Sequence, residues 1–256
     1  MWTRDRMAGY LRRRLGNRRL IVVGNREPYA HERTPEGMRC QEPDAGLVSV
    51  LDPLLQATGG TWIAHGNGSA DRLASDEHGR LKVPPAIGSY ALRRVWLNRL
   101  EEEGWYDRVC HRGLWPLCHT IYHPPEFDLD AWQDYAGVNG KFAQAVVEEA
   151  GGDDCLILVQ NYHFVLLPGL LRSRLRSSTI CYSWHLPWPH PDVFRNCPWR
   201  KQILEGMLAA DLVTFHLKEH GDNFLESARR ESEVEVSPAD ANVRQGPRST
   251  RVRPDP

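Results

Sequence analysis

Two polar residues follow short runs of apolar, β-branched residues, which predict buried strands. Arg26 comes after residues 20–24, and His185 comes directly after residues 179–184. An arginine at a strand end can present a planar fork of donors to a phosphate, although a salt bridge to Glu27 or to another acidic residue of the loop is the ordinary alternative. A histidine there can hydrogen-bond a sugar hydroxyl or polarise a leaving group, or it can cap a loop. These positions therefore offer the chemistry of binding a phosphate and a sugar.

A glycine opens the helical segment that follows the first long loop. Gly46 precedes apolar residues at positions 47, 48, 50, 51, 54 and 55, which is helical spacing. The start of a helix attracts anions, and a glycine there lets a ligand approach the backbone. An ordinary helix start is the simpler alternative, so Gly46 alone is a weak indication.

Aromatic and amide side chains in the middle of the chain are suited to a sugar. Asn161 and Tyr162 follow the most hydrophobic run, residues 155–159, so they are expected to line a cleft. Tyr106 and Trp115 lie in a stretch rich in glycine and aromatic residues. Aromatic faces can stack on the apolar C–H patches of a pyranose ring. A core position for Trp115 explains its presence equally well.

Alternating strands and helices must position these residues. The predicted strands are residues 20–24, 61–64, 92–97, 155–159, 179–184, 212–215 and 250–253, and the predicted helices lie within 46–58, 127–150, 162–175, 199–209 and 216–229. This alternation predicts an α/β fold with a doubly wound, Rossmann-like parallel sheet. Ligands bind at the carboxyl ends of the strands in such sheets. We therefore expect the candidate residues to surround a single cleft.

The composition is that of an ordinary globular protein. The 256 residues are 41% hydrophobic and 25% charged, with a net charge of -1, which gives no basic field for nucleic acid or a membrane surface. No run of apolar residues is long enough to cross a membrane. The six cysteines form no metal-binding pattern, and reduced thiols fit a cytoplasmic protein.

The two ends differ from the middle of the chain. Residues 1–19 are rich in arginine, and a solvated extension fits them better than a targeting peptide. Residues 20–230 form the predicted α/β domain. Residues 231–256 are polar, with one plausible strand at 250–253, which we expect to be an unpaired edge in a mobile tail.

The order and spacing of these motifs resemble the trehalose-6-phosphate synthases between Leu20 and Leu225. The most specific matches are residues 185–189, His-Leu-Pro-Trp-Pro, and residues 210–216, Ala-Asp-Leu-Val-Thr-Phe-His. The resemblance implies the N-terminal lobe of a retaining GT-B glycosyltransferase of trehalose biosynthesis. Such enzymes transfer glucose from a nucleotide-glucose to glucose 6-phosphate, with no metal and no cofactor beyond the nucleotide sugar.

The resemblance also implies a role for each candidate residue. Arg26 would clamp the phosphate of the acceptor, and Gly46 would lie against the phosphates of the donor. His185 would contact the donor glucose and support the transition state, as the catalytic residue. The remaining candidates, Tyr106, Trp115, Asn161 and Tyr162, would contact glucose 6-phosphate.

The sequence departs from the family in several places. Asn161 replaces the usual aspartate, which removes a charged acceptor for sugar hydroxyls. Ala45 replaces a glycine, and His65 replaces a common tryptophan. The family continues beyond this chain into a C-terminal lobe that binds the nucleotide, so the identity of the nucleotide stays open. We expect the chain alone to be a truncated, inactive transferase that binds glucose 6-phosphate weakly.

Two further expectations follow from that missing lobe, and two alternative functions stay open. Trp188 and Trp199 should be unusually exposed, and the exposed face should favour self-association into a homo-oligomer. A glucosylglycerol-phosphate synthase-like transferase is one alternative, which would keep Arg26 but differ around Tyr106 and Trp115. A non-catalytic remnant or a regulatory binding subunit is the other, and Asn161 supports it.

Overall fold

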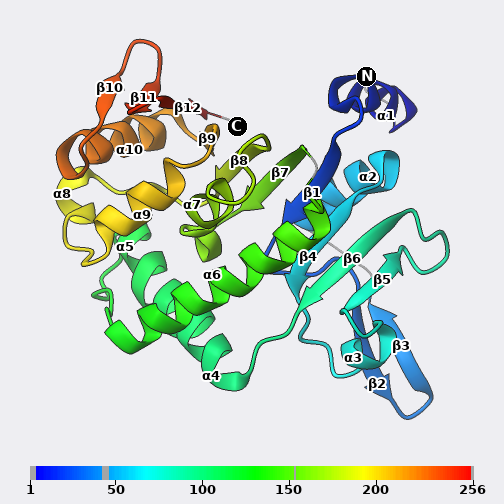
Figure 1. The fold of residues 1–256 in the computed structure, drawn as a ribbon. Coiled ribbons are helices and arrows are strands. Elements are labelled where there is room, and N and C mark those ends of the chain that lie inside the picture. The colour runs from blue at the N-terminus through cyan, green and yellow to red at the C-terminus, as the bar shows by residue number, and fades with distance from the viewer. Residues whose placement is uncertain (1–3, 42–45, 153, 255–256) are drawn as a thin grey trace. The chain divides into compact units, whose positions relative to one another are not determined.

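The computed structural model describes residues 4–41, 46–152 and 154–254. Contacts divide the chain into two compact units. The first consists of Met1–Leu97 and Gln144–Ile157, and the second consists of Asn98–Ala143 and Leu158–Pro256. Both contain helices and largely parallel strands, which confirms the predicted α/β class (Figure 1). Ala45, one of the residues that departs from the family pattern, lies outside the described residues.

The first unit holds the strands around Arg26. Its elements are α1 (Arg4–Leu15), β1 (Arg19–Val23), β2 (Ala30–Thr34), β3 (Gly37–Gln41), α2 (Leu47–Thr58), β4 (Thr61–His65), α3 (Asp71–Ala74), β5 (Arg80–Val83) and β6 (Tyr90–Val95). Strand β4 pairs in parallel with β1 and with β6, whereas β5 pairs antiparallel with β6. Gly60 permits the turn into β4, because its φ of 109° and its contact with the Leu20 carbonyl leave no space for a side chain.

The second unit holds the longer run of elements. These are α4 (Arg99–Glu102), the π-helical segment η1 (Glu103–Leu114), α5 (Trp115–His119), α6 (Leu129–Ala150), β7 (Cys155–Gln160), η2 (Tyr162–Phe164), α7 (Leu167–Arg172), β8 (Thr179–Trp184), α8 (Pro191–Phe194), α9 (Arg200–Met207), β9 (Leu212–Phe215), α10 (Lys218–Glu231), β10 (Glu235–Ser237), β11 (Asn242–Gln245) and β12 (Arg248–Pro254). The residues of α6 and β7 are divided between the two units. Strands β8 and β9 are parallel neighbours, so their carboxyl ends lie at the same edge.

The predicted exposure of Trp188 and Trp199 is wrong. Trp188 is 1% exposed, because it packs against Phe194, Phe215 and Phe224 and its indole N–H donates to the Ser227 hydroxyl at 3.1 Å. Trp199 is 7% exposed and stacks on Trp132 with a centroid separation of 4.5 Å. Both indoles are therefore core residues of the second unit, and neither supplies an exposed apolar patch.

The C-terminal segment contains more structure than its polar composition predicted. The strand expected at 250–253 is present as part of β12, but it is not an unpaired edge. β12 pairs in parallel with β9 and antiparallel with β11, and β10 pairs with β11. The hydroxyl of Thr250 also donates to the carbonyls of Leu208 and Ala210, which fixes the strand to the unit.

Several other elements were not predicted from the sequence. The arginine-rich N-terminus forms α1, which packs on α2 and buries Leu15. The loop after Arg26 contains the β2–β3 hairpin. Among the helices of the described residues, none combines the length and hydrophobicity that a membrane crossing requires.

Candidate functional site

Arg26 lies three residues beyond the carboxyl end of β1, and its side chain is exposed. The alternative of a salt bridge to Glu27 is wrong, because the carboxyl group of Glu27 accepts from the Arg94 guanidinium at 2.6 Å. Within residues 4–41, 46–152 and 154–254, Arg26 makes no ion pair. Its guanidinium is therefore available to an anion from solution, as the prediction of a phosphate clamp requires.

A buried charged cluster fixes the segment that carries Arg26. The fully buried guanidinium of Arg94 contacts Glu27 and, at 2.8 Å, the carboxylate of Asp71. It also donates to the Tyr29 carbonyl at 2.8 Å, and Asp71 accepts from the His31 N–H at 2.7 Å. Three points between positions 27 and 31 are therefore held in place, so the backbone next to Arg26 is anchored.

Burial also changes the proton affinities in this cluster. It raises the pKa of Glu27 to about 9, helped by the nearby Asp71 and opposed by Arg94. The pKa of His31 is lowered, mainly by burial and then by the charge of Arg94. At neutral pH Glu27 therefore keeps its proton, and Asp71 balances the charge of Arg94.

Gly46 lies at the N-terminus of α2, as the sequence predicted. Its φ of 72° favours glycine, and as the N-cap residue it has no side chain with which to cap the helix. The buried Asp52 holds α2 in the first unit by accepting from the hydroxyls of Tyr29 and Tyr90, at 3.2 and 2.6 Å. The first N–H groups of the helix lack partners within the helix, which suits an anion. A contact with donor phosphates remains a prediction.

His185 directly follows β8 in the second unit, and two polar side chains hold its ring. Its Nε2 lies 2.8 Å from Gln160 Oε1, and its Nδ1 lies 3.2 Å from His216 Nε2. Gln160 is the last residue of β7, and His216 directly follows β9. Neither residue was predicted as part of the site, although His216 is the last residue of the family-like motif at residues 210–216.

Asn161 adopts a strained backbone conformation at the end of β7. Its φ of 71° and ψ of 169° lie in a region that glycine populates almost alone. Its side-chain oxygen accepts from the N–H of Tyr162 at 2.9 Å, and its carbonyl accepts from the Tyr182 hydroxyl at 2.8 Å. Strained residues of this kind cluster at binding sites, which supports the prediction that this strand end is functional.

Replacing Asn161 with glycine should stabilise the chain by about 1 kcal/mol, because the strain is relieved and the cap contributes only a few tenths against glycine. Replacing it with alanine should destabilise the chain by about 2 kcal/mol, because the cap is lost and the strain stays. Thermal unfolding measures both changes. Equal midpoints for the two variants would contradict the account of a strained backbone.

The rings of Tyr162 and Tyr106 both contact that of one buried histidine. The ring of His163 is 4.3 Å from that of Tyr162 and is stacked on that of Tyr106 at 5.4 Å. Tyr106 belongs to η1, where i to i+5 hydrogen bonding brings it over His111, with ring centroids 4.3 Å apart. The second unit therefore brings Tyr106 and Tyr162 together, as the prediction of a shared sugar site requires.

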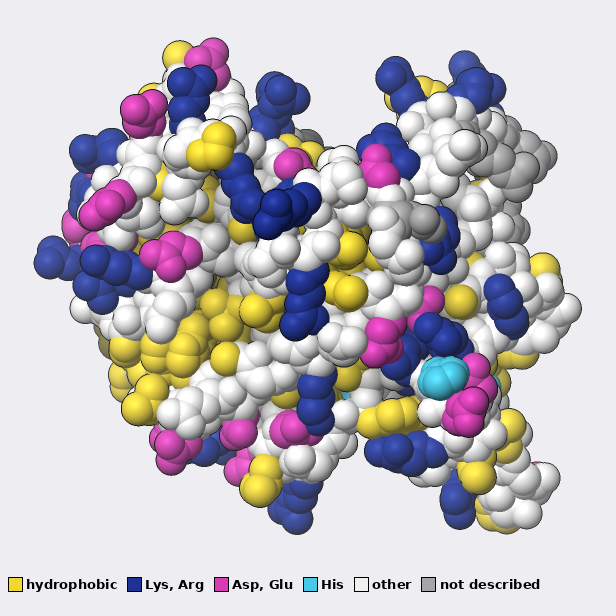
Figure 2. Space-filling view, viewed as in Figure 1, with side chains coloured by type: hydrophobic (Ala, Val, Ile, Leu, Met, Phe, Trp, Pro, Cys, Tyr) yellow, Lys and Arg dark blue, Asp and Glu magenta, His cyan; other side chains and the backbone are white. Residues whose placement is uncertain are grey.

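Trp115 begins α5 directly after η1, and the alternative of a core position is wrong. Its indole is 38% exposed and packs against the tilted ring of His119, with ring centroids 4.2 Å apart. Ile121, Tyr122 and Leu129 are further exposed hydrophobic residues of the following segment. Figure 2 shows hydrophobic side chains gathered at the left, where Figure 1 places α5. An exposed indole is free to stack on a sugar.

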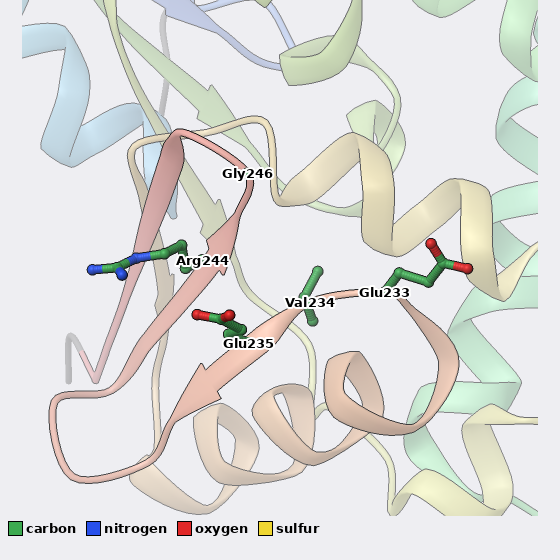
Figure 3. A pocket seen from close by; sticks show the side chains of 5 residues that line it. All are labelled: Glu233, Val234, Glu235, Arg244 and Gly246. Atoms are coloured by element: carbon green, nitrogen blue, oxygen red, sulfur yellow. The ribbon is translucent and has the colours of Figure 1, made fainter.

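A separate surface hollow lies beside β10 and β11. Its lining residues are Glu233, Val234, Glu235, Arg244 and Gly246 (Figure 3). Figure 3 shows the side chains of Glu235 and Arg244 close together, while that of Glu233 points away from them. None of the predicted site residues lines this hollow, so it is not the candidate site. In the described part of the chain, no group of three or more His, Cys, Asp or Glu side chains is placed to bind a metal ion.

Comparison with known proteins identifies close relatives of this sequence. The profile of glycosyltransferase family 20 matches residues 18–256. The trehalose-6-phosphate synthase of Mycolicibacterium smegmatis is 36% identical over 230 residues, which are 90% of this chain and 44% of that protein. The trehalose-6-phosphate synthase of Mycobacterium tuberculosis is 33% identical over the same length, 46% of its own. The chain thus spans about half the length of the curated relatives it matches.

Solved structures share the fold. The alpha,alpha-trehalose 6-phosphate synthase of Burkholderia multivorans superposes with a TM-score of 0.75 at 25% identity, over 93% of this chain and 48% of that one. A trehalose-6-phosphate protein from E. coli bound with UDP-2-fluoro glucose superposes with a TM-score of 0.74 at 24% identity, over 92% of this chain and 48% of that one. The synthase of Burkholderia xenovorans in complex with glucose-6-phosphate superposes with a TM-score of 0.73 at 22% identity, over 93% of this chain and 49% of that one. The fold is therefore that of these GT-B structures over about half their length.

Proposed function

The chain belongs to glycosyltransferase family 20, and from that membership we propose that it is the acceptor-binding, N-terminal lobe of a trehalose-6-phosphate synthase. The complete enzyme would transfer glucose from a nucleotide-glucose to glucose 6-phosphate. The observation that carries the proposal is the 36% identity to the synthase of M. smegmatis across 90% of this chain.

The geometry of Arg26 supports glucose 6-phosphate as the acceptor. Its exposed guanidinium has no ion-pair partner among the described residues, while Glu27 is held by Arg94. An arginine donates to two phosphate oxygens at once, which gives both affinity and orientation. In the second unit, the half-buried Tyr106 and the exposed Trp115 offer aromatic surfaces for the sugar ring, whereas Tyr162 is buried beside His163.

Catalysis in this proposal depends on position and charge more than on covalent chemistry by protein groups. Transfer requires the two sugars to be held face to face and the charge of the leaving diphosphate to be stabilised. Residues of this chain would bind the acceptor, and His185 would contact the donor glucose. The N-terminus of α2 at Gly46 would face the donor phosphates. The nucleotide would be bound mainly by the part of the relatives that this chain does not match.

A complementation assay tests this function. The 256-residue chain is incubated with UDP-glucose and glucose 6-phosphate, alone and with the separately produced C-terminal half of the M. smegmatis synthase. We expect no trehalose 6-phosphate from the chain alone, and measurable product when the other half is present, because half of the transition-state contacts would be absent without it. Rapid turnover by the chain alone would contradict the proposed division of labour.

Asn161 favours a second candidate, a sugar-phosphate-binding subunit without catalytic activity. The amide is a weaker acceptor for sugar hydroxyls than the carboxylate that the family usually has there. Its oxygen is also engaged by the N–H of Tyr162. This candidate would be identified if the chain binds glucose 6-phosphate but gives no product in the complemented assay. Asn161→Asp should then restore formation of the product. Preference for glycerol 3-phosphate as acceptor would instead indicate a glucosylglycerol-phosphate synthase.

A further inference from the structure

Three polar side chains meet at the ends of neighbouring strands in the second unit, and we call Gln160, His185 and His216 the strand-end triad. The parallel register pairs Trp184 of β8 with Phe215 of β9. His185 and His216 are the next residues along these two strands, so their side chains lie side by side on one face. The N–H of Asn161 donates to the Ser183 carbonyl at 2.8 Å, which places Gln160 at the same edge.

The hydrogen bonds of the triad have a defined direction. The side-chain oxygen of Gln160 accepts at 2.8 Å from Nε2 of His185, so Nε2 carries a proton. A neutral imidazole has only one N–H, and Nδ1 of His185 is therefore an acceptor. Nε2 of His216 lies within reach of that lone pair, at 3.2 Å, and donates to it. His216 thus supplies a hydrogen-bond donor to Nδ1, the ring nitrogen of His185 that carries no proton when Nε2 donates to Gln160.

The two partners of His185 differ in burial. Gln160 is 4% exposed and accepts over the shorter distance, so it is a fixed anchor for Nε2. His216 is exposed and makes the longer contact to Nδ1. The Nδ1 side of the ring is consequently the side that a ligand from solution can approach, with His216 as the partner that such a ligand would join or displace.

We propose that His216 is a positioning residue, which together with Gln160 holds neutral His185 in a single tautomer and orientation, with Nε2 protonated and the Nδ1 lone pair on the exposed side. The role of this arrangement in sugar transfer rests on the proposed function. In that setting the ring of His185 accepts a hydrogen bond from a hydroxyl of the donor glucose at Nδ1, and does not donate one. His216 keeps the ring ready for this contact before the sugar arrives.

The test is a long-range ¹H–¹⁵N NMR measurement of the histidine rings in the 256-residue chain, at about pH 8, where unperturbed histidines are neutral. The wild-type chain should show His185 as one tautomer, protonated at Nε2. His216→Leu removes the donor and should give a mixture of the two tautomers. His216→Gln, whose amide N–H can replace the donor, should restore the single tautomer. His78→Leu changes another exposed histidine in the same way and should leave His185 unaffected.

Protonation of His185 at Nδ1 in the wild-type chain would overturn the proposal, and so would a tautomer unchanged by His216→Leu. Calorimetric titration of the same samples with glucose 6-phosphate keeps this result separate from the proposed function. Wild type and His216→Leu should bind glucose 6-phosphate equally, which also shows that the variant is folded. Absence of binding in the wild-type chain would contradict the proposed function while the tautomer result stands by itself.

Discussion

Replacing Arg26 with alanine should weaken the binding of glucose 6-phosphate by about tenfold to a hundredfold and leave the unfolding midpoint unchanged. A hydrogen-bonded contact to a charged group contributes about 1.5–3 kcal/mol, which corresponds to that range of affinity. The fold should not respond, because the side chain is exposed and makes no ion pair with a described residue. Isothermal titration calorimetry and thermal unfolding measure the two quantities.

Two further variants make the result specific to this guanidinium. Arg26→Lys keeps the charge but loses the planar fork, so its affinity should lie between those of the wild type and Arg26→Ala. Arg39→Ala removes another exposed arginine of the same unit, in the β2–β3 hairpin, and should bind as the wild type does. Equal losses for Arg26→Ala and Arg39→Ala would show a diffuse charge effect and contradict a phosphate clamp at Arg26.

Replacing Arg94 with methionine should destabilise the chain by about 3–5 kcal/mol, the usual cost of removing one partner from a buried ion pair. Methionine has a similar length, so the loss comes mainly from leaving the fully buried carboxylate of Asp71 without its cation. The Tyr29 carbonyl would lose its guanidinium donor as well. Chemical denaturation followed by tryptophan fluorescence measures the effect. A loss below about 1 kcal/mol, typical of surface sites, would contradict the anchoring role of the cluster.

Glu27→Gln is the matched control for Arg94→Met in the same cluster. Its neutral side chain has the shape of the protonated carboxyl group of Glu27. The pKa of Glu27, raised to about 9 from 4.5, is higher in the folded than in the unfolded chain. The resulting stabilisation is complete below the unfolded value and is lost as the pH rises toward the folded one. Wild-type stability should therefore fall across this range, and Glu27→Gln should fall less. An identical pH dependence in both proteins would contradict a protonated Glu27 at neutral pH.

The buried strands could be predicted from the sequence because their apolar runs are continuous. Residues 20–24 are all buried, residues 155–159 bury three of five side chains and residues 179–184 bury alternate ones, and β1, β7 and β8 form there. The C-terminal strands were harder to predict, because β10 and β11 carry exposed charged residues on a partly solvated sheet. Their pairing depends on the register with β12, which is a tertiary property.

The helix around Tyr106 illustrates a different limit. Its polar-to-aromatic composition gave no periodic signal, and i to i+5 hydrogen bonding is too rare to expect from a sequence. That geometry is nevertheless what places His111 next to Tyr106. Trp188 was misjudged for another reason. Its exposure was expected because a second lobe would cover it, whereas three phenylalanines from later elements of this chain surround the indole.

The site residues were predicted individually, whereas their partners were not. Arg26 and His185 follow strands as expected, since strand ends can be located from apolar runs. The pairing of Glu27 with Arg94 and of His185 with Gln160 and His216 joins residues far apart in sequence. Such contacts depend on which strands are neighbours and in what register, and no local pattern records that information.

Calorimetric titration of the 256-residue chain with glucose 6-phosphate, glucose and glycerol 3-phosphate tests the central claim most directly. The account predicts saturable, weak binding of glucose 6-phosphate to one site, with glucose and glycerol 3-phosphate each binding at least about tenfold more weakly because one lacks the phosphate and the other the ring. Glucose binding as tightly as glucose 6-phosphate, or no binding of glucose 6-phosphate at all, would contradict an acceptor-binding lobe.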